Sequence, residues 1–248
     1  MREKVKRIWK IILEEFALLS IELIIVLAVG FVSLIAFFTL ADELRENDLK
    51  PFDDWATAVV KATTSDFMTL LMKGVTFLSN REFIIFPAIL IFIYFLFIKR
   101  HRWYSIKIPV VTLGSISLNL LLKYYFERPR PELEHMVHVT GNSFPSGHAM
   151  FSFSFYGLLI YILWEYAPTK FWKYFSLVVL LILIHLIGIS RVYLGVHYPS
   201  DVLAGFAAGF MWLLVSILTI RQIEKFLKKR VKEAALEKAE GSSEPSSG

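Results

Sequence analysis

The sequence FSLVVLLILIHLIGISRVYLGVHYPSDVLAGFAAGFMWLLVSILTI, residues 175–220, decides the fold, because two long apolar runs flank a short polar segment. The runs are Phe175 to Ile189 and Val202 to Ile220, and neither contains an aspartate, glutamate, lysine or arginine. A helix of about 20 apolar residues spans the hydrocarbon core of a bilayer. The pattern therefore predicts two consecutive transmembrane helices, joined at one membrane surface by a polar connection.

Four further apolar runs come earlier in the chain, and they are uncharged or nearly so. They are Phe16 to Leu40, Phe83 to Ile98, Ile108 to Leu122 and Ala149 to Trp164. Hydrophobic residues make up 56% of the 248 residues and are gathered into these runs, which is atypical of a water-soluble domain. The six runs predict an all-α fold, a bundle of six transmembrane helices. The chain has no cysteine, which excludes disulfides, thiolate metal sites and cysteine nucleophiles.

Basic residues flank the predicted spans, and their distribution predicts the orientation of the chain. With six spans, four clusters fall on the same side of the membrane: Arg2 to Lys10, Lys99 to Arg102, Lys170 with Lys173, and Arg221 to Arg230. By the positive-inside rule that side is the cytoplasm, so both termini are predicted to be cytoplasmic. The formal net charge of +5 then indicates contact with membrane lipids, and we expect no nucleic-acid partner.

Segments outside the spans complete the predicted organisation. Residues 1–15 are predicted to form an amphipathic basic N-terminal helix, residues 16–221 the six-span domain, and residues 222–248 a cytoplasmic basic helix and a disordered tail. Between the first and second spans, Pro51 to Asn80 has apolar residues at helical spacing, which predicts an amphipathic helical segment on the outer surface. This segment is interpreted as a lid or packing element, or alternatively as one that admits lipid to a site.

Polar residues gather at three connections on the predicted outer face: KYYFERPRPE after the third span, FPSGH before the fourth, and SRVYLGVHYPSD between the fifth and sixth. These connections bring one set of side chains to a single membrane boundary: Lys123, Arg128, Arg130, Ser146, His148, Arg191, His197 and Asp201. Taken singly, each has a structural explanation, such as an interfacial anchor or a helix cap. Together, cations from separate segments repel one another unless they share an anion. The pattern therefore indicates an anion-binding site.

The residues around FPSGH and His197 indicate what this site does to its anion. Gly147 has no side chain, so backbone N–H groups at the start of the following helix can approach phosphate oxygens. Ser146 adds a hydroxyl group, and His148 lies in the first turn of that helix. His197 and Asp201 are four residues apart and share a helical face, so the carboxylate can orient the imidazole and leave its other nitrogen free to attack. The pattern favours a phosphoryl-transfer site with a histidine nucleophile.

The three segments resemble the signature of the type 2 phosphatidic acid phosphatase family. The matches are a lysine followed after six residues by Arg-Pro (Lys123, Arg130, Pro131), Pro-Ser-Gly-His (Pro145 to His148), and Ser-Arg, five residues, His, three residues, Asp (Ser190, Arg191, His197, Asp201). The resemblance covers the chain from Pro51 to Ile220. The lysine spacing selects Arg130 as the matched arginine, so the motif assigns no role to Arg128.

The resemblance implies a role for each matched residue. His197 is expected to attack phosphorus and form a phosphohistidine, Asp201 to orient it, and His148 to act first as general acid and then as general base. The phosphate oxygens are expected to be held by Lys123, Arg130, Ser146, Gly147 and Arg191. The resemblance implies no metal and no other cofactor, since these cations occupy the place in which magnesium would neutralise charge.

The predicted function is therefore that of a membrane enzyme that hydrolyses the phosphomonoester or pyrophosphate of a lipid at the outer face. Phosphatidylglycerol phosphate is the preferred substrate, with relaxed specificity that extends to phosphatidic acid, and undecaprenyl pyrophosphate of the cell-wall carrier cycle is the alternative. An anion transporter is a hypothesis of another class, but the charges lie at span ends on one side and no internal repeat is found. The sequence indicates no oligomeric state. The small residues from Gly205 to Gly209 predict close helix packing within the monomer.

Overall fold

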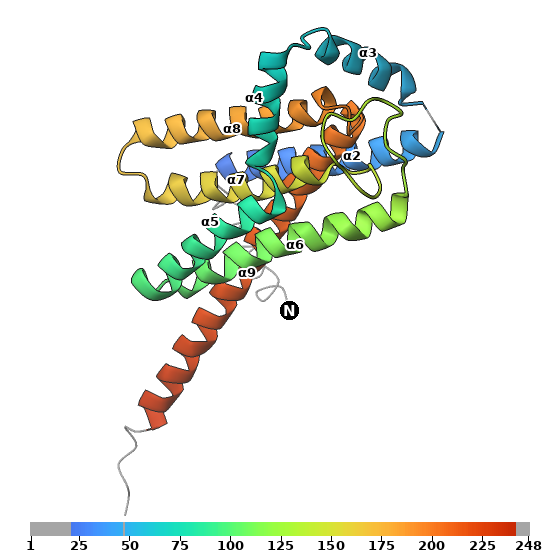
Figure 1. The fold of residues 1–248 in the computed structure, drawn as a ribbon. Coiled ribbons are helices and arrows are strands. Elements are labelled where there is room, and N and C mark those ends of the chain that lie inside the picture. The colour runs from blue at the N-terminus through green and yellow to red at the C-terminus, as the bar shows by residue number, and fades with distance from the viewer. Residues whose placement is uncertain (1–20, 47, 242–248) are drawn as a thin grey trace, which may run out of the picture.

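The computed structural model describes residues 21–46 and 48–241, and it describes side chains for residues 24–44, 46 and 48–231. Over these residues the fold is all-α, with no strand (Figure 1). The amphipathic helix predicted for residues 1–15 lies outside the described part of the chain, as do residues 242–248 of the predicted tail.

The helices include six that can cross a membrane. In chain order they are α2 (Ile21–Glu46), α3 (Lys50–Lys61), α4 (Asp66–Phe77), α5 (Arg81–Ile93), the short π-helix η1 (Tyr94–Ile98), α6 (Arg102–Phe126), α7 (Gly147–Tyr166), α8 (Lys170–Tyr193) and α9 (Pro199–Gly241). The segments long and apolar enough to span are α2, α5 together with η1, α6, α7, α8 and α9. The predicted fold of six spans is confirmed. Helix α9 continues without a break from the last span into the basic segment after residue 221.

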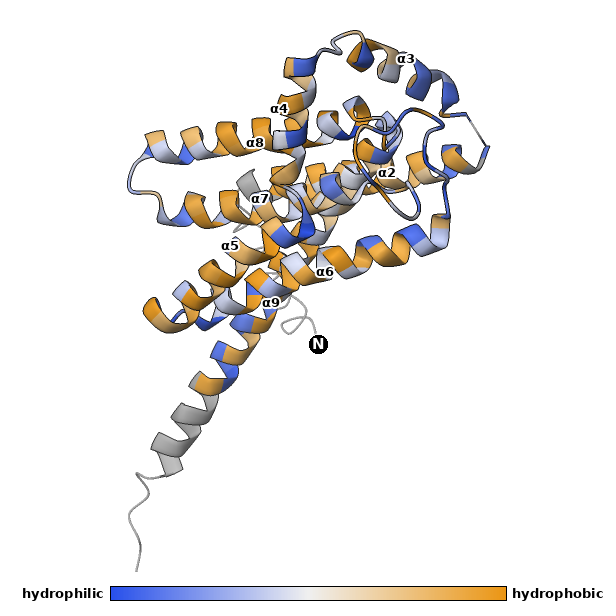
Figure 2. Ribbon diagram, in the orientation of Figure 1, coloured by the Kyte–Doolittle hydropathy of each residue, from blue (hydrophilic) through white to orange (hydrophobic). Residues whose placement is uncertain are grey.

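Hydrophobic residues make up most of the spans (Figure 2), and many of their large apolar side chains lie on the outside of the bundle. Phe31 of α2, Phe86 of α5 and Phe97 of η1 are 64%, 66% and 67% exposed. In water such a surface would be strongly unfavourable, whereas in a bilayer the same side chains lie against lipid tails. The chain is a multi-pass membrane protein.

Helix α7 lies at the centre of the bundle, and 61% of its apolar span is buried, compared with 17% for the spans of α2 and α5. It packs closely against α9, because two glycines of α9 leave room for the α7 backbone. A Cβ atom on Gly205 would lie 2.6 Å from the backbone oxygen of Ser146, and one on Gly209 would lie 2.6 Å from that of Met150. The predicted close packing within the monomer is confirmed, and it holds the start of α7 against the start of α9.

The segment between α2 and α5 forms two amphipathic helices, as predicted, and they pack on α8 and α9. Asp53 of α3 and Thr76 of α4 are buried, whereas Trp55 and Phe67 are 65% and 75% exposed. The hydroxyl group of Tyr193, the last residue of α8, accepts a hydrogen bond from the backbone N–H of residue 65 at 3.2 Å. Polar contacts and the packing of Met72 against Tyr193 therefore both fix α3 and α4 against the bundle, while large apolar side chains such as Trp55 and Phe67 point outward.

Candidate active site

The three predicted connections meet at one end of the bundle, the motif end, where α6 and α8 end and α7 and α9 begin (Figure 1). Glu127 terminates α6 with a left-handed backbone conformation (φ 48°), and Pro129 and Pro131 prevent the helix from continuing. The chain then crosses to α7 as a loop without regular structure, residues 127–146. The loop therefore runs past the start of α9, where Arg128 contacts Ser200 and Asp201, and connects the first motif to the second.

His197 and Asp201 form a buried pair at the motif end, 3% and 0% exposed. Nδ1 of His197 lies 3.4 Å from Oδ2 of Asp201 and 3.3 Å from Oγ of Ser143, which itself donates to the same carboxylate oxygen. Burial lowers the pKa of His197 to about 3, and the hydrogen bond and charge of Asp201 oppose this only in part. The imidazole is therefore neutral at pH 7, and its Nε2 faces Nη1 of Arg130 at 3.5 Å.

Three cations act on His197. Lys123 and Arg130 come from the first motif, and Arg191 comes from the third. Arg191 and Lys123 both contribute to its lowered pKa, and Arg130 contacts its ring. Lys123 donates to a backbone carbonyl, and Arg130 donates to three such oxygens, those of Thr140, Gly141 and Val196. Among the described residues, no carboxylate forms a salt bridge with any of the three cations. The site therefore gathers positive charge that a bound anion would neutralise.

Two buried polar atoms at this site lack a hydrogen-bond partner among the described residues: Oγ of Ser146 and Nε of Arg191. Buried polar atoms are nearly always paired, so these two indicate the position of a ligand acceptor. Gly147 is required by space as well, because a Cβ atom there would lie 2.9 Å from Oδ1 of Asn119. The first-turn N–H groups of α7 lack intrahelical partners and bear partial positive charge. Together with the three cations, these groups form an oxyanion cradle.

His148 follows Gly147 in the first turn of α7. Its Nε2 lies 3.0 Å from Oδ1 of Asn80, the residue that precedes α5. An amide oxygen accepts a hydrogen bond, so this contact holds the ring with an N–H at Nε2. Thr76 of α4 makes a similar contact, accepting from Nη1 of Arg191 at 2.6 Å. The segment from α3 to Asn80 thus supports two side chains of the site from outside.

Comparison with known proteins identifies the family. The pattern that defines the PAP2 superfamily matches residues 104–225. Phosphatidylglycerophosphatase B of Bacillus subtilis is 32% identical over 201 residues, which cover 80% of this chain and 98% of the relative. The chain belongs to the PAP2 superfamily. It is accordingly a membrane phosphatase, and the predicted resemblance to the type 2 phosphatidic acid phosphatases is confirmed.

A second relative and a solved structure are also similar to this chain. The undecaprenyl-diphosphatase of Sulfolobus acidocaldarius is 30% identical over 178 residues, covering 67% of this chain and 78% of that protein. The crystal structure of the transmembrane PAP2-type phosphatidylglycerolphosphate phosphatase from Bacillus subtilis superposes with a TM-score of 0.72 at 28% identity. That match covers 78% of this chain and 96% of the other.

The structure brings the residues of the PAP2 signature to the motif end, and it separates the two arginines of the RPRP stretch. Arg130, which the lysine spacing selects, contacts His197. Arg128, to which the spacing assigned no role, contacts Asp201 and Asp53 instead. Direct contacts place Arg130 and Asp201 beside His197, and Ser146 donates its backbone N–H to the backbone oxygen of Asp201 at 2.9 Å.

Several residues that contact this PAP2 site were not predicted. They are Asp53, Thr76, Asn80, Asn119 and Ser143. Arg128 was predicted to lie at this boundary, but without a role. Asn119 carries a detectable signal, because it is a polar residue inside an apolar run and lies one helical turn before Lys123. The contacts of Asp53, Thr76 and Asn80 depend on how α3 and α4 dock, which the local sequence does not specify.

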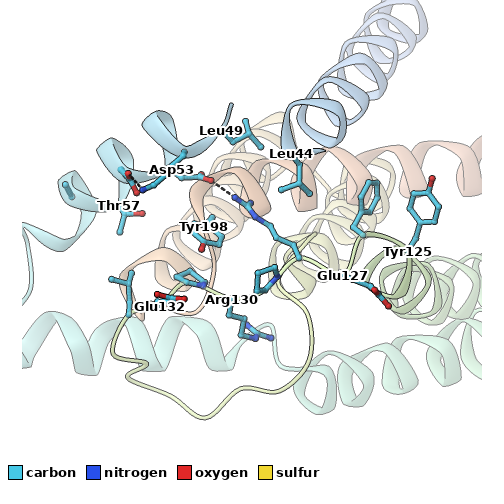
Figure 3. Close-up of a pocket in the computed structure, with 17 residues that line it drawn as sticks. Leu44, Leu49, Asp53, Thr57, Tyr125, Glu127, Arg130, Glu132 and Tyr198 are labelled. Atoms are coloured by element: carbon cyan, nitrogen blue, oxygen red, sulfur yellow. Dashed lines mark hydrogen bonds and ion pairs between the residues drawn. The ribbon is translucent and has the colours of Figure 1, made fainter. Parts of the chain in front are cut away.

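A pocket of about 860 Å³ lies between α3 and the loop that follows α6 (Figure 3). Its polar lining includes Arg130, Tyr198, Asp54 and Glu132, and Leu44 and Leu49 supply part of its apolar lining. Since Arg130 also contacts His197, the pocket adjoins the oxyanion cradle. Its volume is within the range of small-molecule sites, about 300–1,000 Å³.

Proposed function

We propose that this PAP2 protein is a lipid phosphate phosphatase that forms a phosphohistidine at His197. One observation carries the proposal: three cations without a carboxylate partner among the described residues act on a neutral, buried histidine whose other nitrogen is held by Asp201. Such a site stabilises the charge of a phosphoryl group and presents a lone pair to phosphorus.

The proposed first step transfers the phosphoryl group to the protein. The lone pair of His197 Nε2 attacks phosphorus, the bond from phosphorus to the ester oxygen breaks, and His148 donates a proton to the leaving oxygen. Nδ1–H stays directed at Asp201, whose charge stabilises the cationic ring that forms. Lys123, Arg130, Arg191, the Ser146 hydroxyl and the N–H of Gly147 would hold the phosphate oxygens.

The proposed second step returns the site to its starting state. A water molecule attacks phosphorus, and His148, now neutral, accepts the water proton. The phosphorus–Nε2 bond breaks, which releases inorganic phosphate and neutral His197. Charge neutralisation comes from lysine and arginine side chains, so we propose that the reaction is metal-independent.

Phosphatidylglycerol phosphate, with relaxed specificity towards phosphatidic acid and related lipid phosphates, is the proposed substrate. The similarity to phosphatidylglycerophosphatase B across nearly the whole of that protein supports it. Undecaprenyl pyrophosphate is the second candidate, which the similarity to the Sulfolobus acidocaldarius undecaprenyl-diphosphatase supports. The positive-inside distribution of basic residues supports an active site at the extracytoplasmic face, with both termini in the cytoplasm.

Phosphate release in detergent micelles containing a chelator tests the proposal. The parent protein and His197→Ala are compared on phosphatidylglycerol phosphate, phosphatidic acid and undecaprenyl pyrophosphate. His185→Ala is the matched control, because His185 lies on the exposed side of α8 and its Nδ1 contacts the backbone oxygen of Leu181 at 2.7 Å. We expect release by the parent and the control, and a loss of at least about 1,000-fold in His197→Ala.

Two results would overturn parts of this reading. Equal rates in His197→Ala and the parent would refute the assignment of His197 as the nucleophile. Inhibition of the parent by the chelator would refute the proposal that the reaction is metal-independent. The ranking of the three lipids decides the preferred substrate.

A further inference from the structure

Arg128 joins two buried carboxylates. Its Nη1 donates to Oδ1 of Asp201 at 2.7 Å, and its Nη2 donates to Oδ2 of Asp53 at 2.8 Å. The guanidinium group also lies 4.0 Å from the centre of the Tyr198 ring. The carboxylates of Asp53 and Asp201 are 1% and 0% exposed, and the Arg128 side chain is 12% exposed. Charge-assisted hydrogen bonds between buried groups are strong and directional, so this arrangement holds all three side chains in one geometry.

Arg128 contacts the oxygen of Asp201 that does not face His197. Oδ2 of Asp201 receives the His197 ring, the hydroxyl group of Ser143 and the backbone N–H of Tyr198. Arg128 is the partner that the described part of the chain provides for Oδ1. With both oxygens held, the carboxylate cannot rotate about its last side-chain bond. This fixes the direction in which it accepts the proton of His197 Nδ1.

Asp53 in turn fixes Arg128 and the start of α9. Its two oxygens accept from the backbone N–H and the hydroxyl group of Ser200 at 2.9 and 2.7 Å. Ser200 precedes Asp201 in the first turn of α9, and its hydroxyl group lies 2.8 Å from Nη1 of Arg128. In Figure 3, Asp53 reaches from α3 toward the loop that follows α6. The carboxylate of Asp53 thus contacts both Arg128, which binds Asp201, and Ser200, which precedes Asp201 in the chain.

We propose that Arg128 and Asp53 are positioning residues, which hold Asp201 in the orientation that His197 needs and so couple the outer helix α3 to the nucleophile. This inference rests on the proposed function of His197. Arg128 then differs in role from Arg130, although both belong to the RPRP stretch: the first orients the carboxylate, and the second faces the imidazole that attacks.

Asp53→Asn tests the inference, and Asp66→Asn is its matched control. Asp66 begins α4, its side chain is exposed, and it does not line the pocket beside the cradle. Phosphate release is measured over a range of phosphatidylglycerol phosphate concentrations, and inorganic phosphate binding is measured by calorimetry. For Asp53→Asn we expect kcat to fall at least about 10-fold, with KM and the phosphate Kd within about 3-fold of the parent, whereas Asp66→Asn changes none of these values by more than about 2-fold.

A thermodynamic cycle separates positioning from a general loss of structure. Arg128→Gln is expected to lower kcat about as much as the double variant Asp53→Asn with Arg128→Gln, because both changes break the same chain of contacts. Asp53→Glu is expected to recover part of the activity, since it restores the charge at a displaced position.

Specific results would overturn the inference. Additive losses in the cycle, a kcat of Asp53→Asn equal to that of Asp66→Asn, or loss of phosphate binding in step with kcat would each refute positioning. A parent protein that hydrolyses no lipid phosphate refutes the proposed function itself, and the inference falls with it.

Discussion

Inorganic phosphate is expected to stabilise this protein against heat, and Arg191→Met is expected to remove most of that effect. Arg191 is 3% exposed, and its Nε has no partner among the described residues. A hydrogen bond between a charged group and a ligand oxygen contributes about 1.5–3 kcal/mol. A loss near the upper end, about 2.7 kcal/mol, weakens phosphate binding about 100-fold.

The expected shifts in unfolding temperature follow from linkage. At a phosphate concentration about 100-fold above the Kd of the parent, phosphate stabilises the parent by about 2.7 kcal/mol and a variant with 100-fold weaker binding by about 0.4 kcal/mol. With about 2–4 °C per kcal/mol for a protein of this size, Tm rises by about 5–10 °C in the parent and by about 1–2 °C in the variant.

The phosphate-free variant is expected to be about as stable as the parent. Methionine removes a buried donor that lacks a partner, which favours folding by about 1–3 kcal/mol, but it also leaves the Thr76 hydroxyl unpaired at a comparable cost. Tryptophan fluorescence follows unfolding in detergent, in potassium phosphate and in potassium chloride of equal ionic strength. An equal rise of Tm in parent and variant, or no rise in the parent, would refute the assignment of Arg191 to the cradle.

Two further predictions concern packing and pH. Gly205→Ala places a Cβ atom 2.6 Å from the backbone oxygen of Ser146, so α7 and α9 must separate, and we expect a loss of about 1–3 kcal/mol of stability. Gly74→Ala is the control, because its Cβ atom would meet no other atom within 4 Å, and it should change stability by less than about 1 kcal/mol. Equal unfolding midpoints for the two variants would contradict the packing argument. His197 has a pKa of about 3 when folded, against an ordinary value of 6.5, so the unfolded chain binds its proton more readily. The free energy of unfolding that comes from the neutral form of His197 is fully present above pH 6.5 and is lost as the pH falls towards 3. By pH 4.5 this loss reaches about 2.7 kcal/mol. His197→Gln should lose less stability than the parent between pH 7.5 and pH 4.5, and an equal loss in both proteins would show that His197 is not buried in its neutral form.

The sequence predicts the spans and the motifs because both depend on short-range patterns. Long apolar runs mark the helices, and the four-residue spacing of His197 and Asp201 places both side chains on one helical face before any tertiary contact is known. Counting spans then brings separate motifs to one membrane surface. The spacing also selects, from two arginines in the RPRP stretch, the one that contacts His197.

The contacts that support the site could not be predicted, because they depend on docking between distant segments. Asp53 and Asp54 are adjacent and chemically alike, yet one is buried against Arg128 and the other is exposed. Which of them faces the bundle is decided by the rotation of α3 about its axis, and that rotation is fixed by packing on α8 and α9. The same applies to Asn80, which contacts His148 only because α4 and α5 meet beside the start of α7.

The alternating direction of the spans has an electrostatic consequence for the motif end. Lys123 lies in the last turn of α6 and Arg191 in the last turn of α8, where the C-terminal end of each helix dipole carries a partial charge of about −0.5. Backbone dipoles therefore offset part of the charge of these two cations while the site is empty. Helices α7 and α9 present their positive N-terminal ends to the same space. An arriving phosphate thus meets four helix termini of both signs. The first two motifs share one loop, whereas two crossings of the membrane, α7 and α8, separate the second motif from the third.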